Sequence, residues 1–259
     1  MKLSIYQIDA FANMAFKGNP AAIVPLNEWL SEGIMQAIAE ENNLSETAFF
    51  VPVKDAFHIR WFTPIKEVRL CGHATLASAF VLFNILGLQP DSVTFNSLSG
   101  PLVVSRKNGI LTMSFPSQPP LPCETPEEVI KGLGRVPVGC LRCEDFVVVF
   151  ENHEDIANIV PNHEYLKKLD LRGVIVTAPS LEYDFVARFF APKYGIPEDP
   201  VTGSAYTQLM PYWAEVFGRK KLKAKQISAR GGELICELKG DRVLISGTAI
   251  KYLEGTIEI

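Results

Sequence analysis

The sequence predicts an α+β protein of two pseudo-symmetric halves, each a curved β-sheet or barrel wrapped around one central buried helix. Three observations predict this class. A pentapeptide recurs about half a chain apart, and each half carries a glycine-started apolar stretch of the same length. Most other segments have the composition of short strands. One helix and many strands per half favour sheets that curve around the helix.

The repeat is the strongest of these signals. Residues 60–64 read Arg-Trp-Phe-Thr-Pro, and residues 188–192 read Arg-Phe-Phe-Ala-Pro. A loop and a small motif follow each copy, Gly-His-Ala at 72–74 and Gly-Ser-Ala at 203–205, so the second loop is three residues longer. Agreement of the pentapeptide, the glycine motif and the following apolar stretch indicates an internal duplication.

The apolar stretches after these motifs, 73–86 and 204–217, predict the two central helices. Their apolar residues lie nearly all round the helix, which is typical of a helix buried on every side. The stretches end at Gly87 and Gly218, which suit the left-handed position after a helix. Pro211 is expected to kink the second helix.

Strands are predicted where β-branched and aromatic residues stand between Gly, Pro or Asn. Asn108-Gly109 predicts a hairpin turn, and Ser31 is expected to cap a helix that ends near residues 42–43. The basic run 219–225 is interpreted as a solvated helix end. The predicted strands cover residues 3–8, 21–24, 47–51, 58–62, 102–105, 111–115, 146–150, 174–177, 184–190, 234–238 and 242–246.

The proline-rich segment 116–122 is interpreted as the connection between two domains. Successive prolines cannot donate ladder hydrogen bonds and favour extended backbone. We therefore predict an N-terminal domain over 1–116 and a C-terminal domain over 117–259. The last strand is expected to pack with the N-terminal domain.

Composition favours a soluble, fully folded globular protein. Hydrophobic residues make up 47% of the chain and the net charge is −4, without the basic excess of a nucleic-acid binder. The longest apolar run, 74–88, is broken by Asn84 and is too short for a bilayer core of about 30 Å. Five cysteines without framework spacing predict a cytoplasmic location, with no membrane partner. The lone CxxC motif at Cys140 and Cys143 is not interpreted as a zinc site.

The glycines at the helix starts are candidate ligand-binding positions. A helix N-terminus has unpaired N–H groups and about half a positive charge. Gly72 and Gly203 would let a carboxylate or an enolate-like oxyanion approach these groups. The alternative is that each glycine only turns the chain into its helix.

Three side chains are candidates for proton transfer. His73 stands at a helix start, where a neutral imidazole is expected; the alternative is a packing histidine. Asp199 precedes the second glycine and could instead cap the helix. Glu46 leads into an apolar strand, and a partly buried carboxyl suits a group that takes and returns a proton. The alternative is an exposed carboxylate at a strand start.

The sequence contains none of the common nucleotide, flavin or metal motifs. It has no P-loop, no strand-linked GxGxxG, no HExxH and no GxSxG. We therefore predict no cofactor and no metal. The tripeptide 18–20, Gly-Asn-Pro, is interpreted as a turn.

Together these motifs resemble the phenazine-biosynthesis-protein-F-like family, which is related in fold to diaminopimelate epimerase. The resemblance runs over most of the chain in the family's order, and the motifs are jointly specific. The matching stretches are Asp9-Ala10-Phe11, Phe16-Lys17-Gly18-Asn19-Pro20-Ala21, Asn43-Leu44-Ser45-Glu46-Thr47, Arg60-Trp61-Phe62-Thr63-Pro64, Cys71-Gly72-His73-Ala74-Thr75, Arg188-Phe189-Phe190-Ala191-Pro192 and Glu198-Asp199-Pro200-Val201-Thr202-Gly203-Ser204-Ala205.

The resemblance implies cofactor-free isomerase chemistry in a homodimer, with the active site in a cleft between two pseudo-symmetric domains. By position, Glu46 resembles the family's general acid/base. His73, Asp199 and Ser204 resemble its polar residues around a small carboxylate-bearing substrate. The helix-start N–H groups would come from Gly72 and Gly203.

One departure bears on mechanism. The epimerase relatives use two opposed cysteines, whereas here the glycines are preceded by Cys71 in one half and Thr202 in the other. A two-thiol racemisation is therefore not expected, although both residues stay candidates for substrate contact. The second half also has no glutamate opposite Glu46, since its stretch 169–173 reads Leu-Asp-Leu-Arg-Gly.

Three functions follow from this sequence. The first is an isomerase in which Glu46 moves a proton on one face of a small carboxylate-bearing metabolite. The second is a racemase or epimerase assisted by Cys71. The third is a metabolite-binding protein without catalysis on the same scaffold.

Overall fold

The computed structural model describes residues 1–259, which divide into two compact units. The first unit comprises residues 1–114 and 246–259, and the second comprises residues 115–245. The chain crosses between the units within strand β8 (Ile110–Pro116) and again within β16 (Arg242–Gly247). Residues of the two chain ends therefore belong to the same unit.

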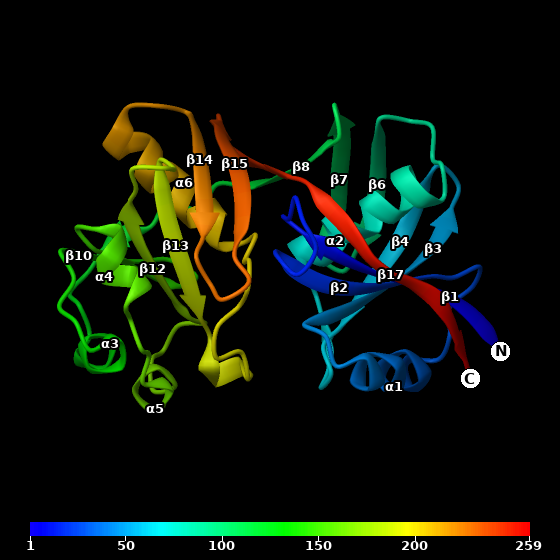
Figure 1. Cartoon of the computed structure of the whole chain (residues 1–259), viewed down its shortest axis with the longest axis horizontal. Helices are drawn as coiled ribbons and strands as arrows, with labels where there is room; N and C mark the ends of the chain where they lie inside the picture. Colours follow the sequence, from blue (N-terminus) through cyan, green and yellow to red (C-terminus); the bar gives the residue numbers. More distant parts are fainter. The chain divides into compact units, whose positions relative to one another are not determined.

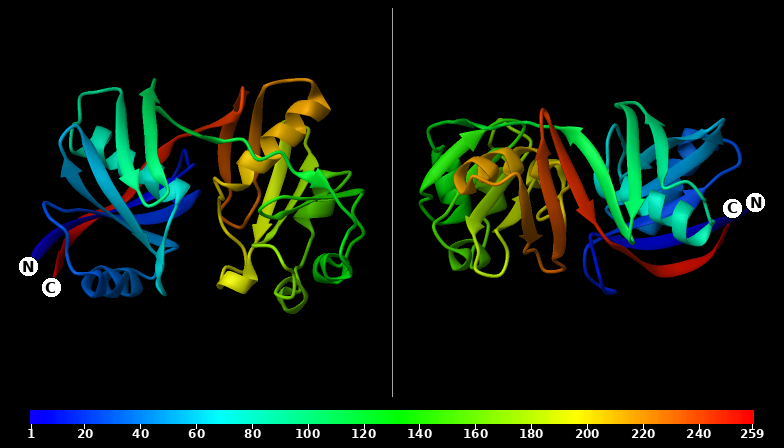
Figure 2. Two further views of the ribbon diagram at one scale, coloured as in Figure 1. Left: turned by 180° about the vertical axis from the view of Figure 1, so that it is seen from behind. Right: turned by 90° about the horizontal axis from the view of Figure 1, so that it is seen from above.

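The first unit is a strongly twisted set of strands that includes both termini. Strand β17 pairs antiparallel with β1, from Ala249 opposite Ala10 to Glu258 opposite Lys2, so the two chain ends lie side by side (Figures 1 and 2). Strands β2 and β3 are parallel and are joined by helix α1. Besides β8, the elements are β1 Lys2–Ala10, β2 Asn19–Pro25, α1 Glu32–Asn42, β3 Glu46–Val53, β4 Ala56–Phe62, β5 Glu67–Val68, α2 Gly72–Phe80, β6 Ser92–Ser97, β7 Gly100–Lys107 and β17 Ala249–Glu258.

Helix α2 is the central helix of this unit and contacts strands β1, β2, β3, β7 and β17 (Figure 1). Its side chains from His73 to Ala79 are all buried, as their apolar composition predicted. The predicted helix is only partly α-helical, because residues Val81–Ile85 form a π-helix that closes with a bond from Leu86 N–H to Val81 O. Gly87 then takes a left-handed φ of 72°, as expected.

The second unit has its own strands and its own central helix, α6 (Figure 1). Strands β11 and β12 are parallel, and β12 pairs antiparallel with β13, which repeats the β2–β3–β4 arrangement of the first unit. The elements are β9 Leu121–Pro122, α3 Glu127–Leu133, β10 Gly139–Arg142, β11 Phe146–Val149, α4 His153–Ala157, α5 His163–Leu166, β12 Val174–Pro179, β13 Phe185–Phe190, a 3₁₀ turn Pro192–Tyr194, α6 Ala205–Phe217, β14 Lys221–Gln226 and β15 Gly232–Lys239.

Helix α6 packs against β14 and β15, and most of its side chains are buried. Trp213 on this helix stacks on Phe185 of β13, with ring centroids 5.6 Å apart. The helix begins at Ala205, one residue later than predicted, and ends at Gly218 with a left-handed φ of 61°. The fold is thus α+β with one central helix in each unit, as the sequence predicted.

Every predicted strand coincides with an observed one, and the Asn108-Gly109 hairpin and the Ser31 cap are confirmed. The interpretation of the basic run 219–225 was wrong. Residues Lys221–Gln226 form strand β14, in which lysines alternate with buried residues such as Leu222 and Ala224. No helix of the structure is both long and apolar enough to cross a membrane.

Candidate active site

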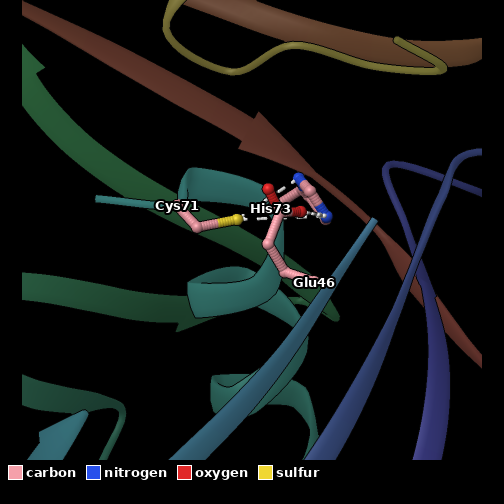
Figure 3. A group of neighbouring side chains, drawn as sticks. All are labelled: Glu46, Cys71 and His73. Atoms are coloured by element: carbon pink, nitrogen blue, oxygen red, sulfur yellow. Dashed lines mark hydrogen bonds and ion pairs between the residues drawn. The ribbon is translucent and has the colours of Figure 1, made fainter. Parts of the chain in front are cut away.

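Three side chains of the first unit meet where strand β3 begins and helix α2 starts (Figure 3). Glu46 is the first residue of β3, Cys71 caps α2, and His73 is its second residue. The His73 Nε2 atom lies 3.0 Å from Glu46 Oε2, and the Cys71 Sγ atom lies 3.5 Å from His73 Nδ1. The first copy of the glycine motif thus places His73 in contact with Glu46, the predicted acid.

These side chains are almost out of contact with solvent. The side chains of His73 and Glu46 are 7% and 13% exposed, and Cys71 is buried. Although Glu46 Oε2 is close enough to Nε2 for an ion pair, it has no aligned hydrogen-bond donor. Hydrogen-bond strength falls steeply with angle, so the short distance alone does not give this oxygen a hydrogen bond. Glu46 Oε2 is therefore a buried oxygen with a free position for a proton.

The expectation of a neutral His73 imidazole was wrong. Burial lowers the pKa of His73, but the negative charges that Cys71 and Glu46 can carry raise it, and the net pKa lies well above the ordinary value. The effect of Cys71 and Glu46, which the expectation did not consider, is larger than the effect of burial.

Cys71 is a thiol rather than a thiolate at neutral pH. Burial, reinforced by the negative charge of Glu46, raises the pKa of Cys71 to about 11. A thiolate is the reactive form of cysteine, so this environment suppresses nucleophilic and basic behaviour. The side-chain N, O and S atoms of Glu46, Cys71 and His73 lie within 4.8 Å of one another.

A fourth residue, Asn19, belongs to this group. The interpretation of residues 18–20 as a turn was wrong, because Asn19 is the first residue of strand β2 and is fully buried. Its Nδ2 atom lies 3.3 Å from His73 Nδ1, and its Oδ1 atom accepts a hydrogen bond of 3.2 Å from the Ser45 hydroxyl. Because Gly, Asn and Pro are typical turn residues, nothing in the sequence indicated this contact.

In the second unit, the residues around Gly203 form a separate hydrogen-bonded group. The Thr202 hydroxyl donates to the Asp199 carboxylate at 2.5 Å, and the Thr202 N–H donates to the buried Gln226 side chain. Ser204 precedes α6 and makes no capping hydrogen bond with its side chain. The prediction that one substrate meets the groups of both units stays a prediction.

An arginine that the sequence did not single out reaches Ser204. The Arg172 Nη2 atom donates to the Ser204 hydroxyl at 3.0 Å and to Asp145 at 2.5 Å. Asp145 is fully buried and also accepts from the Gln208 side chain of α6 at 2.7 Å. This network fixes the start of α6 on the strands beside it. Asp145 lies in a polar turn, which gave no sequence signal for burial.

The recurring arginine has the same structural role in both halves. Arg60 donates to Glu67 at 2.7 Å, and Arg188 donates to Glu198 at 2.7 Å. The second pair spans three more residues, as expected from the longer loop. Glu198 therefore clamps the loop that leads to the second helix start, and it does not cap the helix.

Strand pairing identifies the second-half counterpart of Glu46. Phe49 lies opposite Arg60 and Val176 lies opposite Arg188, so counting back three residues in each strand equates Glu46 with Gly173. A Cβ atom on Gly173 would come within 2.7 Å of the Phe190 carbonyl oxygen. The second half thus has no room for a side chain at the position of the acid.

The duplicated α+β scaffold places the chain among proteins that are named as isomerases. The sequence profile of the PhzC-PhzF family, described as phenazine biosynthesis-like protein, matches residues 8–255. An uncharacterized isomerase of Pseudomonas aeruginosa is 49% identical over 259 residues, which cover 100% of both chains. Another uncharacterized isomerase, from Halalkalibacterium halodurans, is 42% identical over 262 residues and 99% of both chains.

The crystal structure of a PhzF-family phenazine biosynthesis protein from Enterococcus faecalis agrees with a TM-score of 0.98 at 46% identity, covering 100% of both chains. The chain therefore belongs to the PhzC-PhzF family of phenazine biosynthesis-like proteins. It is an isomerase.

Proposed function

We propose that this isomerase works without a cofactor and that Glu46 is its general acid/base. Glu46 takes a proton from a carbon or heteroatom of a small carboxylate-bearing metabolite and returns it elsewhere on the same face. The observation that carries the proposal is the buried Glu46 Oε2 atom, which has no aligned donor and lies 3.0 Å from His73 Nε2. A buried carboxylate with one unsatisfied oxygen is suited to proton exchange.

The neighbouring residues have supporting roles in this proposal. His73 and Asp199 orient the substrate and share in proton transfer. The N–H groups that follow Gly72 and Gly203 hold its carboxylate, since a helix start favours an anion. The substrate is contacted by Cys71, Thr202 and Ser204. A homodimer and a cytoplasmic location rest on the sequence alone and stay predictions.

The test is a screen of small carboxylic acids for deuterium uptake from heavy water, with Glu46→Gln as the deciding variant. General acid/base groups contribute roughly 10²–10⁴-fold to rate, so we expect exchange to slow by about 100-fold or more. Glu41→Gln is the matched control, because Glu41 is exposed on α1. Exchange by Glu46→Gln within about threefold of the parent rate would remove Glu46 from this role.

Cys71 supports a second candidate, because its Sγ atom contacts His73 Nδ1 at 3.5 Å. In this candidate the thiol takes part in racemisation or epimerisation. The raised pKa of Cys71, about 11, argues against it near neutral pH. Cys71→Ala distinguishes the two, since a loss as large as that of Glu46→Gln would favour the cysteine-assisted reaction.

A further inference from the structure

The Asn19 side chain connects two partners of opposite hydrogen-bonding character. Its Nδ2 atom faces His73 Nδ1 at 3.3 Å, and its Oδ1 atom faces the Ser45 hydroxyl at 3.2 Å. Asn19 is fully buried and His73 is 5% exposed, so water does not readily replace either contact. The other ring nitrogen of His73 faces Glu46. Nδ1 thus faces Asn19 and, at 3.5 Å, the Cys71 sulfur, whereas Nε2 faces Glu46.

A buried imidazole needs different partners in its two protonation states. In the neutral ring with hydrogen on Nε2, Nδ1 accepts a hydrogen bond, and the Asn19 amide nitrogen can donate it. In the cation, Nδ1 carries a hydrogen and needs an acceptor. A half-turn of the amide presents Oδ1 to Nδ1 with almost no change of shape, because the amide oxygen and nitrogen are nearly isosteric.

The Ser45 hydroxyl completes this arrangement, since it can either donate or accept. It donates to Asn19 Oδ1 in the first orientation and would accept from Nδ2 in the second. In either orientation the amide oxygen and the amide nitrogen each keep one of these two partners, and a lost partner would cost free energy. A carboxylate at position 19 could pair only with the cation, because it accepts hydrogen bonds and donates none. An apolar side chain could pair with neither state.

We propose that Asn19 is a positioning residue that pairs with Nδ1 of His73 in both protonation states. The His73 ring can then exchange a proton with Glu46 without changing its orientation. The role in turnover rests on the proposed function of Glu46. Glu46, from β3, and Cys71, from the start of α2, are the titratable groups that contact the imidazole within its unit. The Cys71 thiol is a weak donor and a poor substitute for the amide.

The experiment is a substrate-free nitrogen-15 NMR titration of the histidine rings. The chain has four histidines, and His73→Gln assigns the signal. In Asn19→Asp, which keeps the shape of the side chain, a carboxylate near Nδ1 raises the pKa of His73 by roughly one to three pH units. In Asn19→Leu, the cation loses its acceptor and the pKa falls. Both variants slow deuterium exchange by about tenfold or more.

Asn96→Asp is the matched control, because Asn96 pairs in strand register with His58. This variant leaves the titration of His73 unchanged. Opposite shifts of His73 in the two Asn19 variants, with slower exchange in both, support the proposal, because a purely structural role would not reverse the direction. If Asn19→Leu does not fold, the upward shift in Asn19→Asp decides.

Three results would overturn the proposal: no shift of His73 in Asn19→Asp, shifts of the same sign in both variants, or opposite shifts with unchanged exchange. The NMR result does not depend on Glu46 being the catalytic acid/base. A correct pair of shifts together with full exchange by Glu46→Gln would therefore reject the proposed function and leave the contact between Asn19 and His73 established.

Discussion

Replacing Asp145 by alanine tests whether the start of α6 is held by a buried charge network. The Asp145 carboxylate is fully buried and accepts hydrogen bonds from Arg172 at 2.9 and 2.5 Å and from Gln208 at 2.7 Å. Its removal takes the acceptor away from the Gln208 Nε2 atom and from part of the guanidinium, while Gln208 Oε1 still accepts from the backbone N–H of residue 145 at 3.1 Å. Ser204 at the helix start then depends on an arginine that is no longer fixed.

The magnitude follows from the burial of the two partners. Removing one member of a buried ion pair costs about 3–5 kcal/mol. The Arg172 side chain is 29% exposed and keeps Glu144 at 3.1 Å, so part of its charge stays solvated or paired. We therefore expect Asp145→Ala to lower the free energy of unfolding by about 2–3 kcal/mol.

Urea unfolding monitored by fluorescence and circular dichroism measures this loss. Asp170→Ala is the matched control, because Asp170 pairs with Arg142 at 3.0 Å while 65% of its side chain is exposed. That variant is expected to lose less than about 1 kcal/mol. A double-mutant cycle of Asp145→Ala with Arg172→Met reports the coupling. Equal losses for the two aspartate variants, or strict additivity in the cycle, would refute the network.

Three further outcomes follow from individual contacts. Because the pKa of Cys71 is about 11, iodoacetamide modifies Cys71 about 100-fold more slowly than an ordinary cysteine at neutral pH, and the rate rises about tenfold with each unit increase in pH up to pH 11; equal rates in the folded and urea-unfolded protein would contradict this. Glutathione disulfide couples Cys123 to Cys140, whose sulfurs are 3.6 Å apart, releasing two glutathione molecules; intact-mass analysis and Cys123→Ser check the bond. Gly173→Ala costs about 1–3 kcal/mol, whereas Gly33→Ala, with open space around its Cβ, costs nothing measurable in the same unfolding assay.

The sequence predicted best those elements whose burial can be inferred from their own residues. The central helices were found because their side chains are apolar on every face. Strand β14 was misjudged because its outward lysines gave it the composition of a solvated segment. The π-helix after α2 had no signal, since a change from i+4 to i+5 hydrogen bonds depends on packing and leaves the composition unchanged.

The site residues were predictable only where a short local sequence motif contains them. Glu46 and His73 flank short motifs, and the structure places them in contact. Asn19 and Arg172 act through partners 54 and 32 residues away, which no local pattern encodes. The protonation of His73 was misjudged because the expectation considered only the helix start, whereas contacts with Cys71 and with Glu46, which is distant in sequence, raise the pKa of His73.

The divergence of the two halves has a packing cause that the residue types alone did not reveal. Gly173 occupies the position of Glu46, and any side chain there would collide with Phe190 and the Phe189 ring. The preceding residue, Arg172, reaches the start of α6 in its place and holds Ser204. Restoring an acid at Gly173 would require repacking β13, so a second proton-transfer group cannot arise there by a single substitution. The second half therefore has no counterpart of Glu46, because of the close packing at Gly173.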